Sequence, residues 1–473
     1  MSENDFIDEE KIIHEINVLF TEGKFETSID KLHEFRYKYP NSHYLAQTYY
    51  LSGLTLYKLD QRFKAKYYLK QCIFQNKKNI WEIKSGFLLG QILYQDRFFE
   101  DGFNILVMTL EKLTYIGFNS ISKKNLDQIY LILAEISLNQ KKDKNLAYQY
   151  FININFSNLD NDSRNKYYLI QKKLRWNYLP HYKIGLQDGN ISALCVDDDD
   201  IWIGTWNGGL ARYTLSSGKS EVFTMGKTQL LDNAIRAIEI TDNYVWVGTF
   251  YGLSVYSKAS SKWKTIDQIN GIKPEIISVI KFFNGNFFVG TLGSGLFVFN
   301  IAMNKWTHFS QKSIAYILSI ENFNDNLLVG TMTSGINIFD LTNNSITNFQ
   351  TINDLLPSKN ITMILFIDND LWIGSYGSGL FKYNFDNEQL FCYSKKSGEI
   401  ADDWLLCGTR TENAVYFGTF GGGVSVYYPN TNTWEKLDLS KGLNSFDVAS
   451  IASSSKNVYF GTLGEGVSIY NEQ

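Results

Sequence analysis

One short phrase returns seven times in the C-terminal part of this 473-residue chain, and it limits the possible folds more than any other feature. The first copy reads WIGTWNGGLARY from Trp202, and the last reads VYFGTLGEGVSIY from Val458. Successive copies lie 44, 42, 40, 44, 44 and 43 residues apart, counted between the anchoring glycines Gly204, Gly248, Gly290, Gly330, Gly374, Gly418 and Gly461. So regular a period indicates a repeat architecture in which each copy is one structural unit.

Each copy has the pattern of a β-hairpin. Aromatic and β-branched residues lead into Gly-Thr (Gly-Ser in one copy), a glycine-rich turn follows, and a second alternating run ends in Tyr or Phe. Another apolar run precedes the hairpin, such as ISALCV from Ile191, and a short run often led by Trp follows it, such as KWKTI from Lys262. Four strands in a repeat of this length make one blade of a propeller. The sequence therefore predicts a seven-bladed β-propeller.

The two ends of this repeat region predict how the ring closes. The last copy ends at Tyr470, so the seventh blade has no outer strand after it in the sequence. Trp176 lies 28 residues before Gly204, and the comparable Trp434 lies 27 residues before Gly461. We expect residues 174–182 to supply the missing strand from the N-terminal side, which would cover two exposed sheet edges.

The repeated phrase can be compared with a known family. The pattern W-[IV]-G-T-x-x-G-G-[LV]-x-x-[YF], preceded by G-L-x-x-N, resembles the two-component regulator propeller repeat over residues 176–473. Gly185-Leu186 with Asn190, and Gly442-Leu443 with Asn444, match the preceding signature in part. The resemblance implies a propeller like those that form the ligand-sensing domains of many hybrid histidine kinases.

Up to about residue 175 glycine is sparse and the apolar residues follow a helical period. Gly53 and Ala65, and again Gly90 and Gly102, stand twelve residues apart, where the two helices of a hairpin must approach closely. These helix pairs are similar to the tetratricopeptide repeat. A fourth pair is expected to begin near Ile129, after an irregular linker at 114–124. The predicted architecture is a tetratricopeptide-like α-helical superhelix over residues 1–171, followed by the all-β propeller over residues 172–473.

Composition excludes several classes of protein. The 45 Lys and Arg against 49 Asp and Glu give a net charge of −4, which argues against a nucleic-acid partner. No apolar run is long enough to predict insertion in a membrane. The four cysteines form no C-x-x-C pair, and the five histidines lack the spacing of a zinc-binding helix, so no metal site is predicted. We expect a cytoplasmic protein with reduced thiols, and a periplasmic or envelope-associated location is the alternative.

No catalytic motif stands in the structural context that it needs. G-x-G triplets such as Gly293-Ser294-Gly295 lie within predicted hairpin turns and open no helix, so they are not phosphate loops. The acidic run Asp197–Asp200 fits a solvated turn better than a calcium site, which needs six or more converging oxygens. We predict a protein that is not an enzyme and that uses no cofactor.

Two surfaces are candidates for binding. On the propeller face that carries the turns between second and third strands, an aromatic collar around an acidic floor suits a Lys- or Arg-bearing loop of a partner. The alternative is that the aromatics pack between blades and the carboxylates cap strand starts. The predicted residues of this face are Trp206, Asn207, Phe250, Tyr251, Glu275, Tyr376, Asp403, Phe420, Asp447 and Glu465.

The second candidate surface is the groove of the helical half. Polar and aromatic residues on a first-helix face are typical of a peptide groove, because a packed face would favour Leu and Ala. The alternative is that an adjoining segment of the same chain fills the groove. The predicted residues are Gln47, Tyr50, Tyr57, Lys84, Phe87, Gln91 and Tyr94.

Two repeat architectures without catalytic residues favour a non-enzymatic scaffold. Its helical groove and propeller face would each bind one or more proteins or peptides and so hold a multiprotein assembly together. The alternative function is a ligand-sensing propeller of a signalling system, with a small molecule as its ligand.

Overall fold

The computed structural model describes residues 3–75, 79–118 and 121–472. The chain divides into two compact units, Met1–Leu174 and Arg175–Gln473. No helix within the described residues is long and apolar enough to cross a membrane.

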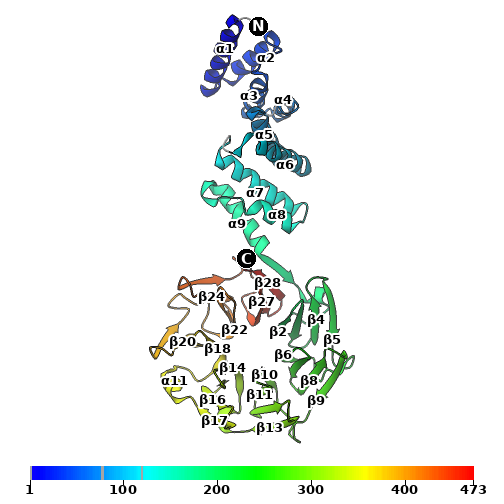
Figure 1. Cartoon of the computed structure of the whole chain (residues 1–473), viewed down its shortest axis with the longest axis vertical. Helices are drawn as coiled ribbons and strands as arrows, with labels where there is room; N and C mark the ends of the chain where they lie inside the picture. The colour runs from blue at the N-terminus through cyan, green and yellow to red at the C-terminus, as the bar shows by residue number, and fades with distance from the viewer. Residues whose placement is uncertain (1–2, 76–78, 119–120, 473) are drawn as a thin grey trace. The chain divides into compact units, whose positions relative to one another are not determined.

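The first unit is α-helical, and its helices follow one another as hairpins (Figure 1). Their bounds are α1 (Glu3–Thr21), α2 (Phe25–Lys38), α3 (Leu45–Lys58), α4 (Arg62–Ile73), α5 (Ile80–Gln95), α6 (Phe99–Ile116), α7 (Lys123–Asn139), α8 (Lys144–Phe151) and α9 (Asn161–Arg175). The predicted class of this half, a region of paired helices, is confirmed, whereas its assignment to the tetratricopeptide family stays a prediction.

The small residues of the first unit lie where paired helices touch. A Cβ atom on Gly53 would lie 2.6 Å from Leu69 Cγ, so α4 packs directly on the backbone of α3. A Cβ atom on Gly90 would lie 2.4 Å from Leu106 Cδ2, which gives α5 and α6 the same close approach. The twelve-residue spacing therefore marks real helix crossings.

Helices extend into both ends of the linker expected at 114–124, of which residues 119–120 lie outside the described part of the chain. Helix α6 continues to Ile116, and α7 begins at Lys123 rather than near Ile129. The Ser122 hydroxyl accepts a hydrogen bond from Asn125 N at 3.2 Å and so caps the start of α7. A serine cap satisfies one of the free N–H groups of the first turn, and the helix can therefore start earlier than its apolar pattern suggests.

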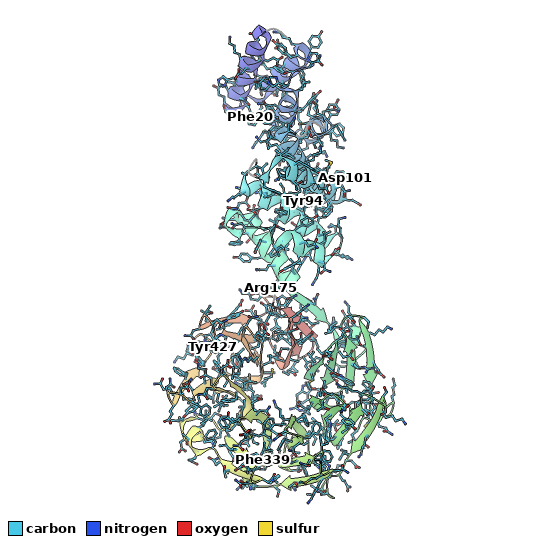
Figure 2. The ribbon with its side chains drawn as sticks, viewed as in Figure 1. Phe20, Tyr94, Asp101, Arg175, Phe339 and Tyr427 are labelled. Atoms are coloured by element: carbon cyan, nitrogen blue, oxygen red, sulfur yellow. The ribbon has the colours of Figure 1, made fainter. Side chains whose placement is uncertain are left out.

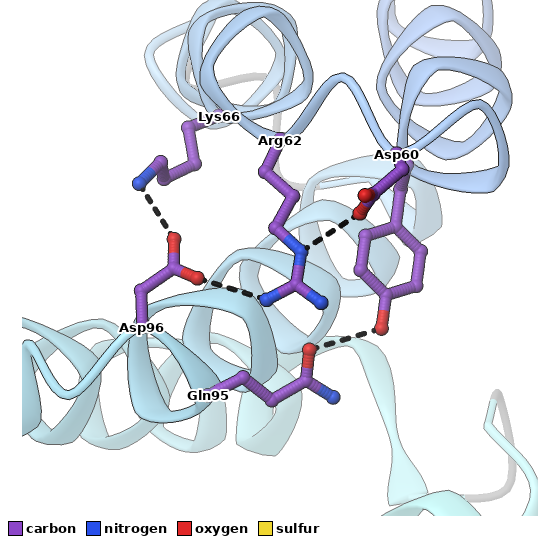
Figure 3. Close-up of polar contacts among 6 residues, drawn as sticks. Asp60, Arg62, Lys66, Gln95 and Asp96 are labelled. Carbon is purple, nitrogen blue, oxygen red and sulfur yellow. Dashed lines mark hydrogen bonds and ion pairs between the residues drawn. The ribbon is translucent and has the colours of Figure 1, made fainter.

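Polar contacts join consecutive hairpins of the first unit (Figure 3). Arg62, at the start of α4, donates to Asp60 at 3.1 Å and to Asp96 at 3.0 Å, and Asp96 ends α5. Lys66 Nζ donates to the other Asp96 oxygen at 2.8 Å, and this bond is the main reason that the pKa of Asp96 lies below its usual value. Arg62, Lys66 and Asp96 thus link the start of α4 to the end of α5.

In the second unit, the described residues form seven four-stranded antiparallel sheets, which confirms the predicted propeller (Figure 1). Blades 1–3 consist of β2 (Ile191–Asp197), β3 (Asp200–Thr205), β4 (Leu210–Thr214), β5 (Lys219–Phe223); β6 (Ile235–Ile240), β7 (Tyr244–Thr249), β8 (Gly252–Ser257), β9 (Lys262–Ile266); and β10 (Ile277–Phe283), β11 (Asn286–Thr291), β12 (Leu296–Asn300), β13 (Lys305–Phe309).

Blades 4–6 have the same order. They consist of β14 (Ile317–Phe323), β15 (Asn326–Thr331), β16 (Ile336–Asp340), β17 (Ser345–Asn348); β18 (Ile361–Ile367), β19 (Asp370–Ser375), β20 (Leu380–Asn384), β21 (Gln389–Tyr393); and β22 (Leu405–Arg410), β23 (Val415–Thr419), β24 (Val424–Tyr428), β25 (Thr433–Leu437). Two short helices, α10 (His181–Ile184) and α11 (Gln350–Leu355), lie in connections.

Blade 7 closes the ring as predicted. Its inner strands are β26 (Val448–Ser453), β27 (Asn457–Thr462) and β28 (Gly466–Asn471), and its outer strand is β1 (Trp176–Leu179) from the start of the unit. Strand β1 pairs antiparallel with β28, with Trp176 opposite Tyr470 and Leu179 opposite Val467. The pairing removes the free edge of β28 and ties the two ends of the propeller together.

The threonine of the repeated phrase holds the hairpin turn that follows it. In blade 1, the buried Thr205 hydroxyl donates to Gly209 O at 2.9 Å and accepts from Gly208 N at 2.7 Å. Blades 2–7 have the same donation to a turn carbonyl, from Thr249, Thr291, Thr331, Ser375, Thr419 and Thr462. Serine can replace threonine in blade 5 because the bond needs only the hydroxyl.

The glycine of the phrase makes room for the next blade. A Cβ atom on Gly204 would lie 2.5 Å from Ile235 Cγ2, and one on Gly461 would lie 2.6 Å from Ile191 Cγ2. Ile235 and Ile191 are fully buried and are the first residues of the inner strands of the following blades. Each glycine therefore leaves space for the first side chain of the next blade's inner strand, including where blade 7 meets blade 1.

Candidate functional site

Every inner strand of the propeller carries a β-bulge at its second residue. In β2, the pairing register with β3 shifts between Ile191 and Ala193, and the other six inner strands shift at the equivalent point. A bulge leaves one residue unpaired and redirects its side chain. The residues so released are Ser192, Arg236, Ser278, Leu318, Thr362, Leu406 and Ala449.

All seven bulged residues, one from the inner strand of each blade, line a single cavity of about 520 Å³. The other described residues in its lining come from the turns and strand mouths of the same face: Trp206, Met332, Asn360, Tyr376, Phe420 and Leu463. The leading residue of each inner strand points the other way, toward the glycine of the preceding blade. Seven local irregularities thus converge on one central pocket.

The polar side chains of the cavity have distinct roles. The hydroxyls of Ser192, Ser278 and Thr362 donate to the backbone oxygens of Ile235, Ile317 and Leu405 in the next blade. Each hydroxyl hydrogen is therefore used between blades, and the oxygen lone pairs are left as acceptors.

Arg236 brings a cation into this cavity. Its guanidinium carbon lies 4.2 Å from the centre of the Trp206 ring, close enough for a cation–π contact. Within the described residues, the buried Nε of Arg236 has no hydrogen-bond partner. Burial lowers the pKa of Arg236 from its ordinary value. The guanidinium thus stacks on an aromatic ring, and none of the ion pairs among the described residues includes it.

The structure brings three of the predicted face residues together in the cavity. Trp206, Tyr376 and Phe420 all line it and are each about 40–45% exposed, as is Trp404, whose ring lies 4.4 Å from that of Tyr376. The predicted aromatic collar thus extends over blades 1, 5 and 6.

The other predicted aromatic and amide residues of this face lie outside the described lining. Tyr251 is exposed, and Lys273 Nζ lies 5.3 Å from its ring. Phe250 is half-buried in the same turn. Asn207 donates its backbone N–H to Asp188 Oδ2 at 2.9 Å, so Asp188 caps the turn of blade 1.

The predicted carboxylates are likewise absent from the described lining of the cavity: Glu275, Asp403, Asp447 and Glu465. Asp403 accepts from Lys395 N at 2.7 Å and so caps a turn. Glu275 and Glu465 are exposed, and Asp447 is half-buried. Arg236 is the one charged side chain among the described lining residues, so the cavity has a cationic rather than an acidic interior.

Sequence reasoning missed the bulged residues. They occupy the second position of each apolar run that begins an inner strand, as in IRAIEI from Ile235. Comparing this column across the seven copies would have singled out Arg236, because the other six residues are uncharged. Within the described residues, no cluster of three or more His, Cys, Asp or Glu side chains could hold a metal ion.

The first unit has a cavity of its own, of about 480 Å³. Four of the seven predicted groove residues line it: Tyr50, Lys84, Phe87 and Gln91. Residues of α7 and its cap complete the described lining: Ser122, Asn125, Gln128 and Ile129, with Ile121, Leu54 and Leu88. Lys84 Nζ lies 4.4 Å from the centre of the Trp81 ring, which holds the ammonium beside the cavity.

The remaining predicted groove residues make other contacts. Tyr94, labelled in Figure 2, donates to Glu135 at 2.6 Å and accepts from Lys166 at 2.9 Å. Tyr57 donates to Gln95 Oε1 at 3.0 Å. Gln47 is half-buried and lies outside the described lining.

A family model described as two component regulator propeller matches residues 185–207, which run from the first Gly-Leu pair into the first repeated phrase. No curated protein matches the chain.

Solved structures of the same fold come from B. thetaiotaomicron. The extracellular domain assigned to the one component system BT4673 is 22% identical, with a TM-score of 0.51 over 63% of this chain and 40% of its own. The extracellular domain assigned to the hybrid two component system BT3049 is 16% identical, with a TM-score of 0.52 over 63% of this chain and 42% of its own. This chain thus matches only about two fifths of each of those structures. Its C-terminal unit is similar to regulator propellers, and the likeness shows the fold.

Proposed function

We propose that the propeller is the non-enzymatic ligand-recognition domain of a signalling system and that the central cavity is its binding site. The observation that carries this proposal is the set of seven bulges. A repeated scaffold directs seven equivalent positions into one pocket, yet fills them with Ser, Arg, Ser, Leu, Thr, Leu and Ala. A site for an asymmetric ligand requires different side chains at positions that the repeat makes geometrically equivalent.

The dimensions and lining of the cavity support a small ligand. A volume of about 520 Å³ lies in the range of small-molecule sites, which combine apolar walls with few polar groups. The matching family model and the extracellular domains from B. thetaiotaomicron further support a role in signal recognition. They also favour the periplasmic or envelope-associated location over the cytoplasmic one.

Filling the cavity tests this function. We expect Ala449→Phe to abolish the thermal stabilisation that a library of sugars, amino acids and organic acids produces in the wild-type protein. A ligand at 100 times its Kd stabilises the folded state by about 2.7 kcal/mol, which a thermal-shift assay detects. The control is Lys84→Ala, in the cavity of the other unit, which should leave the response intact. A response that survives Ala449→Phe in a folded protein would contradict the proposal.

A specific observation also favours a second function, partner binding by the helical unit. The described lining of its cavity combines Tyr50 and Phe87 with Lys84 and amide side chains, a mixture suited to a peptide from another protein. The protein would then connect ligand recognition by the propeller to a partner held by the helices, which retains part of the scaffold hypothesis.

Reversing the groove charge tests this second function. We expect Lys84→Glu to remove a stoichiometric partner from the protein purified from its native cell, because the ammonium would be replaced by a carboxylate beside the same rings. Quantitative mass spectrometry of the co-purified proteins measures the loss. Ala449→Phe serves as the matched control and should retain the partner. Equal recovery with both variants would refute partner binding in this groove.

A further inference from the structure

The electrostatics of the central cavity indicate which class of ligand it would accept. Arg236 is the one charged residue in the described lining, and its six counterparts in the other blades are uncharged. The Trp206 ring contacts this half-buried cation, but no described carboxylate pairs with it, and partial burial without a paired anion is costly. An anionic group of a ligand would supply the missing interaction.

Two carboxylates on neighbouring segments, Glu239 and Asp188, bind other groups. Glu239, three residues along the same strand β6, accepts from Phe282 N at 2.8 Å and lies near Lys281. Lys281 in turn forms an ion pair with Glu321 at 3.3 Å. Asp188 accepts from the backbone N–H groups of Asn190 and Asn207. No ion pair joins Arg236 to any carboxylate in the described part of the chain.

The orientation of Arg236 suits recognition of a carboxylate. Its guanidinium carbon lies 4.2 Å from the Trp206 ring centre, and Trp206 itself lines the cavity. Stacking restricts the guanidinium, so less conformational entropy is lost when it forms paired hydrogen bonds. A guanidinium and a carboxylate match as two parallel N–H···O bonds.

Several oxygens of the cavity can accept hydrogen bonds from donors on a ligand. Ser192, Ser278 and Thr362 have used their hydroxyl hydrogens on backbone oxygens, which leaves their lone pairs for acceptance. The Asn360 amide oxygen is buried and, within the described residues, has no hydrogen-bond partner. Trp206, Tyr376 and Phe420 offer ring faces against which a flat or apolar part of a ligand can pack.

We propose that this cavity binds a small monocarboxylate that also carries hydroxyl or amine donors on a ring-sized body. The inference rests on the proposed function, and it adds the charge and the donor pattern of the ligand. A single guanidinium balances a single negative charge, and the hydroxyl and amide oxygens of the lining offer acceptors to hydroxyl or amine donors on the ligand. A cationic cavity favours an anionic ligand, whereas the basic partner loop expected from the sequence at the surrounding face stays a prediction.

Matched pairs of probes test the carboxylate directly. Quinate and inositol are both hydroxylated six-membered rings, but only quinate has a carboxylate. Tyrosine and tyrosinamide likewise differ in the carboxylate, and they represent ligands whose hydrogen-bond donor is an amine. We expect quinate, tyrosine or both to raise the melting temperature of the full chain at millimolar concentration, and we expect inositol and tyrosinamide to leave it unchanged.

Arg236→Met provides the matching variant, because it keeps an unbranched stem beside Trp206 and removes the charge. We expect it to weaken binding of the responding acid by about tenfold to a hundredfold, the usual effect of losing charge-assisted hydrogen bonds. Circular dichroism of the ligand-free variant checks that it remains folded. Arg236→Lys should restore part of the affinity, because it returns the charge without the bidentate geometry.

The outcomes separate this inference from the function on which it rests. Equal binding of quinate and inositol that is unaffected by Arg236→Met but abolished by Ala449→Phe would overturn the monocarboxylate and retain the cavity as a site. Binding that survives both variants would overturn both proposals. If none of the four probes changes the melting temperature, the monocarboxylate proposal is also overturned, and the wider library then tests the cavity as a site.

Discussion

Replacing Trp176 by alanine is expected to lower the free energy of unfolding of the propeller by about 3–5 kcal/mol, the usual cost of truncating a large buried aromatic residue. Trp176 is only 3% exposed. Its ring centre lies 4.9 Å from that of Tyr470 and 5.9 Å from that of Phe460. A Cβ atom on Gly442 would lie 2.4 Å from Trp176 Cδ1, so the indole also rests directly on backbone. The substitution would leave a cavity among three neighbours.

This tryptophan has a further role because it anchors the strand that closes the ring. Strand β1 has only four residues and pairs along its whole length with β28. Without the indole, few buried side chains would keep β1 in place, and the edge of β28 would be exposed whenever it detached. We therefore expect faster proteolysis near residues 172–182 in addition to the lower stability.

Tryptophan fluorescence in a guanidinium titration measures this effect selectively. Nine of the ten tryptophans lie in the second unit, with Trp81 as the exception, so the signal reports mainly on the propeller. The control is Tyr182→Ala, an aromatic truncation nearby at a side chain that is 68% exposed, and it should change stability by about 0.5 kcal/mol or less. Equal midpoints for the two variants would show that the ring does not depend on β1.

The fold could be predicted because its determinants are local and are repeated. The threonine hydroxyl bonds to a turn four residues away, and the glycine receives a side chain at a fixed place in the next blade. Because of these two constraints, the same Gly-Thr pair stands in all seven copies, except that Ser375 replaces the threonine in one of them. Closure could be predicted for the same reason, since Trp176 occupies in blade 7 the place that Trp434 occupies in blade 6.

The site could be predicted only in part. The aromatic residues Trp206, Tyr376 and Phe420 follow from their places in the hairpin turns, but the charge of the interior does not. Simple alternation assigns residues to two faces of a strand, and a bulge shifts that assignment by one residue. The sequence pattern does not mark the bulge, so Arg236 was not recognised as a lining residue.

The groove of the helical unit shows a similar limit. Helical periodicity places Tyr50, Lys84, Phe87 and Gln91 on one face, and the structure brings all four to one cavity. The same reasoning includes Tyr94, whose hydroxyl instead joins Glu135 and Lys166. Periodicity locates a face, whereas hydrogen bonds between repeats depend on side chains that are distant in the sequence.

The second large effect is expected at the seam between the last blade and the first. Gly461→Ala should destabilise the propeller by about 1–3 kcal/mol, the typical cost of overpacking. The new methyl group would lie 2.6 Å from Ile191 Cγ2 and 3.1 Å from Leu194 Cδ1, both closer than van der Waals contact. Ile191 is fully buried at the start of β2, so it cannot turn away into solvent.

A double-mutant cycle shows whether space is the reason for this glycine. Ile191→Ala removes the Cγ2 atom that would lie 2.6 Å from the new methyl group, so the tightest remaining contacts would be those at 3.1 Å with Ile191 Cβ and Leu194 Cδ1. Gly461→Ala should therefore cost less in the Ile191→Ala background than in the wild type, with a coupling of about 0.5–3 kcal/mol for residues in contact. Fluorescence-monitored unfolding of the four proteins gives the coupling. An equal cost in both backgrounds would mean that the glycine serves the backbone of β27, and the interlocking of side chain and glycine would then not explain why this residue recurs in every blade.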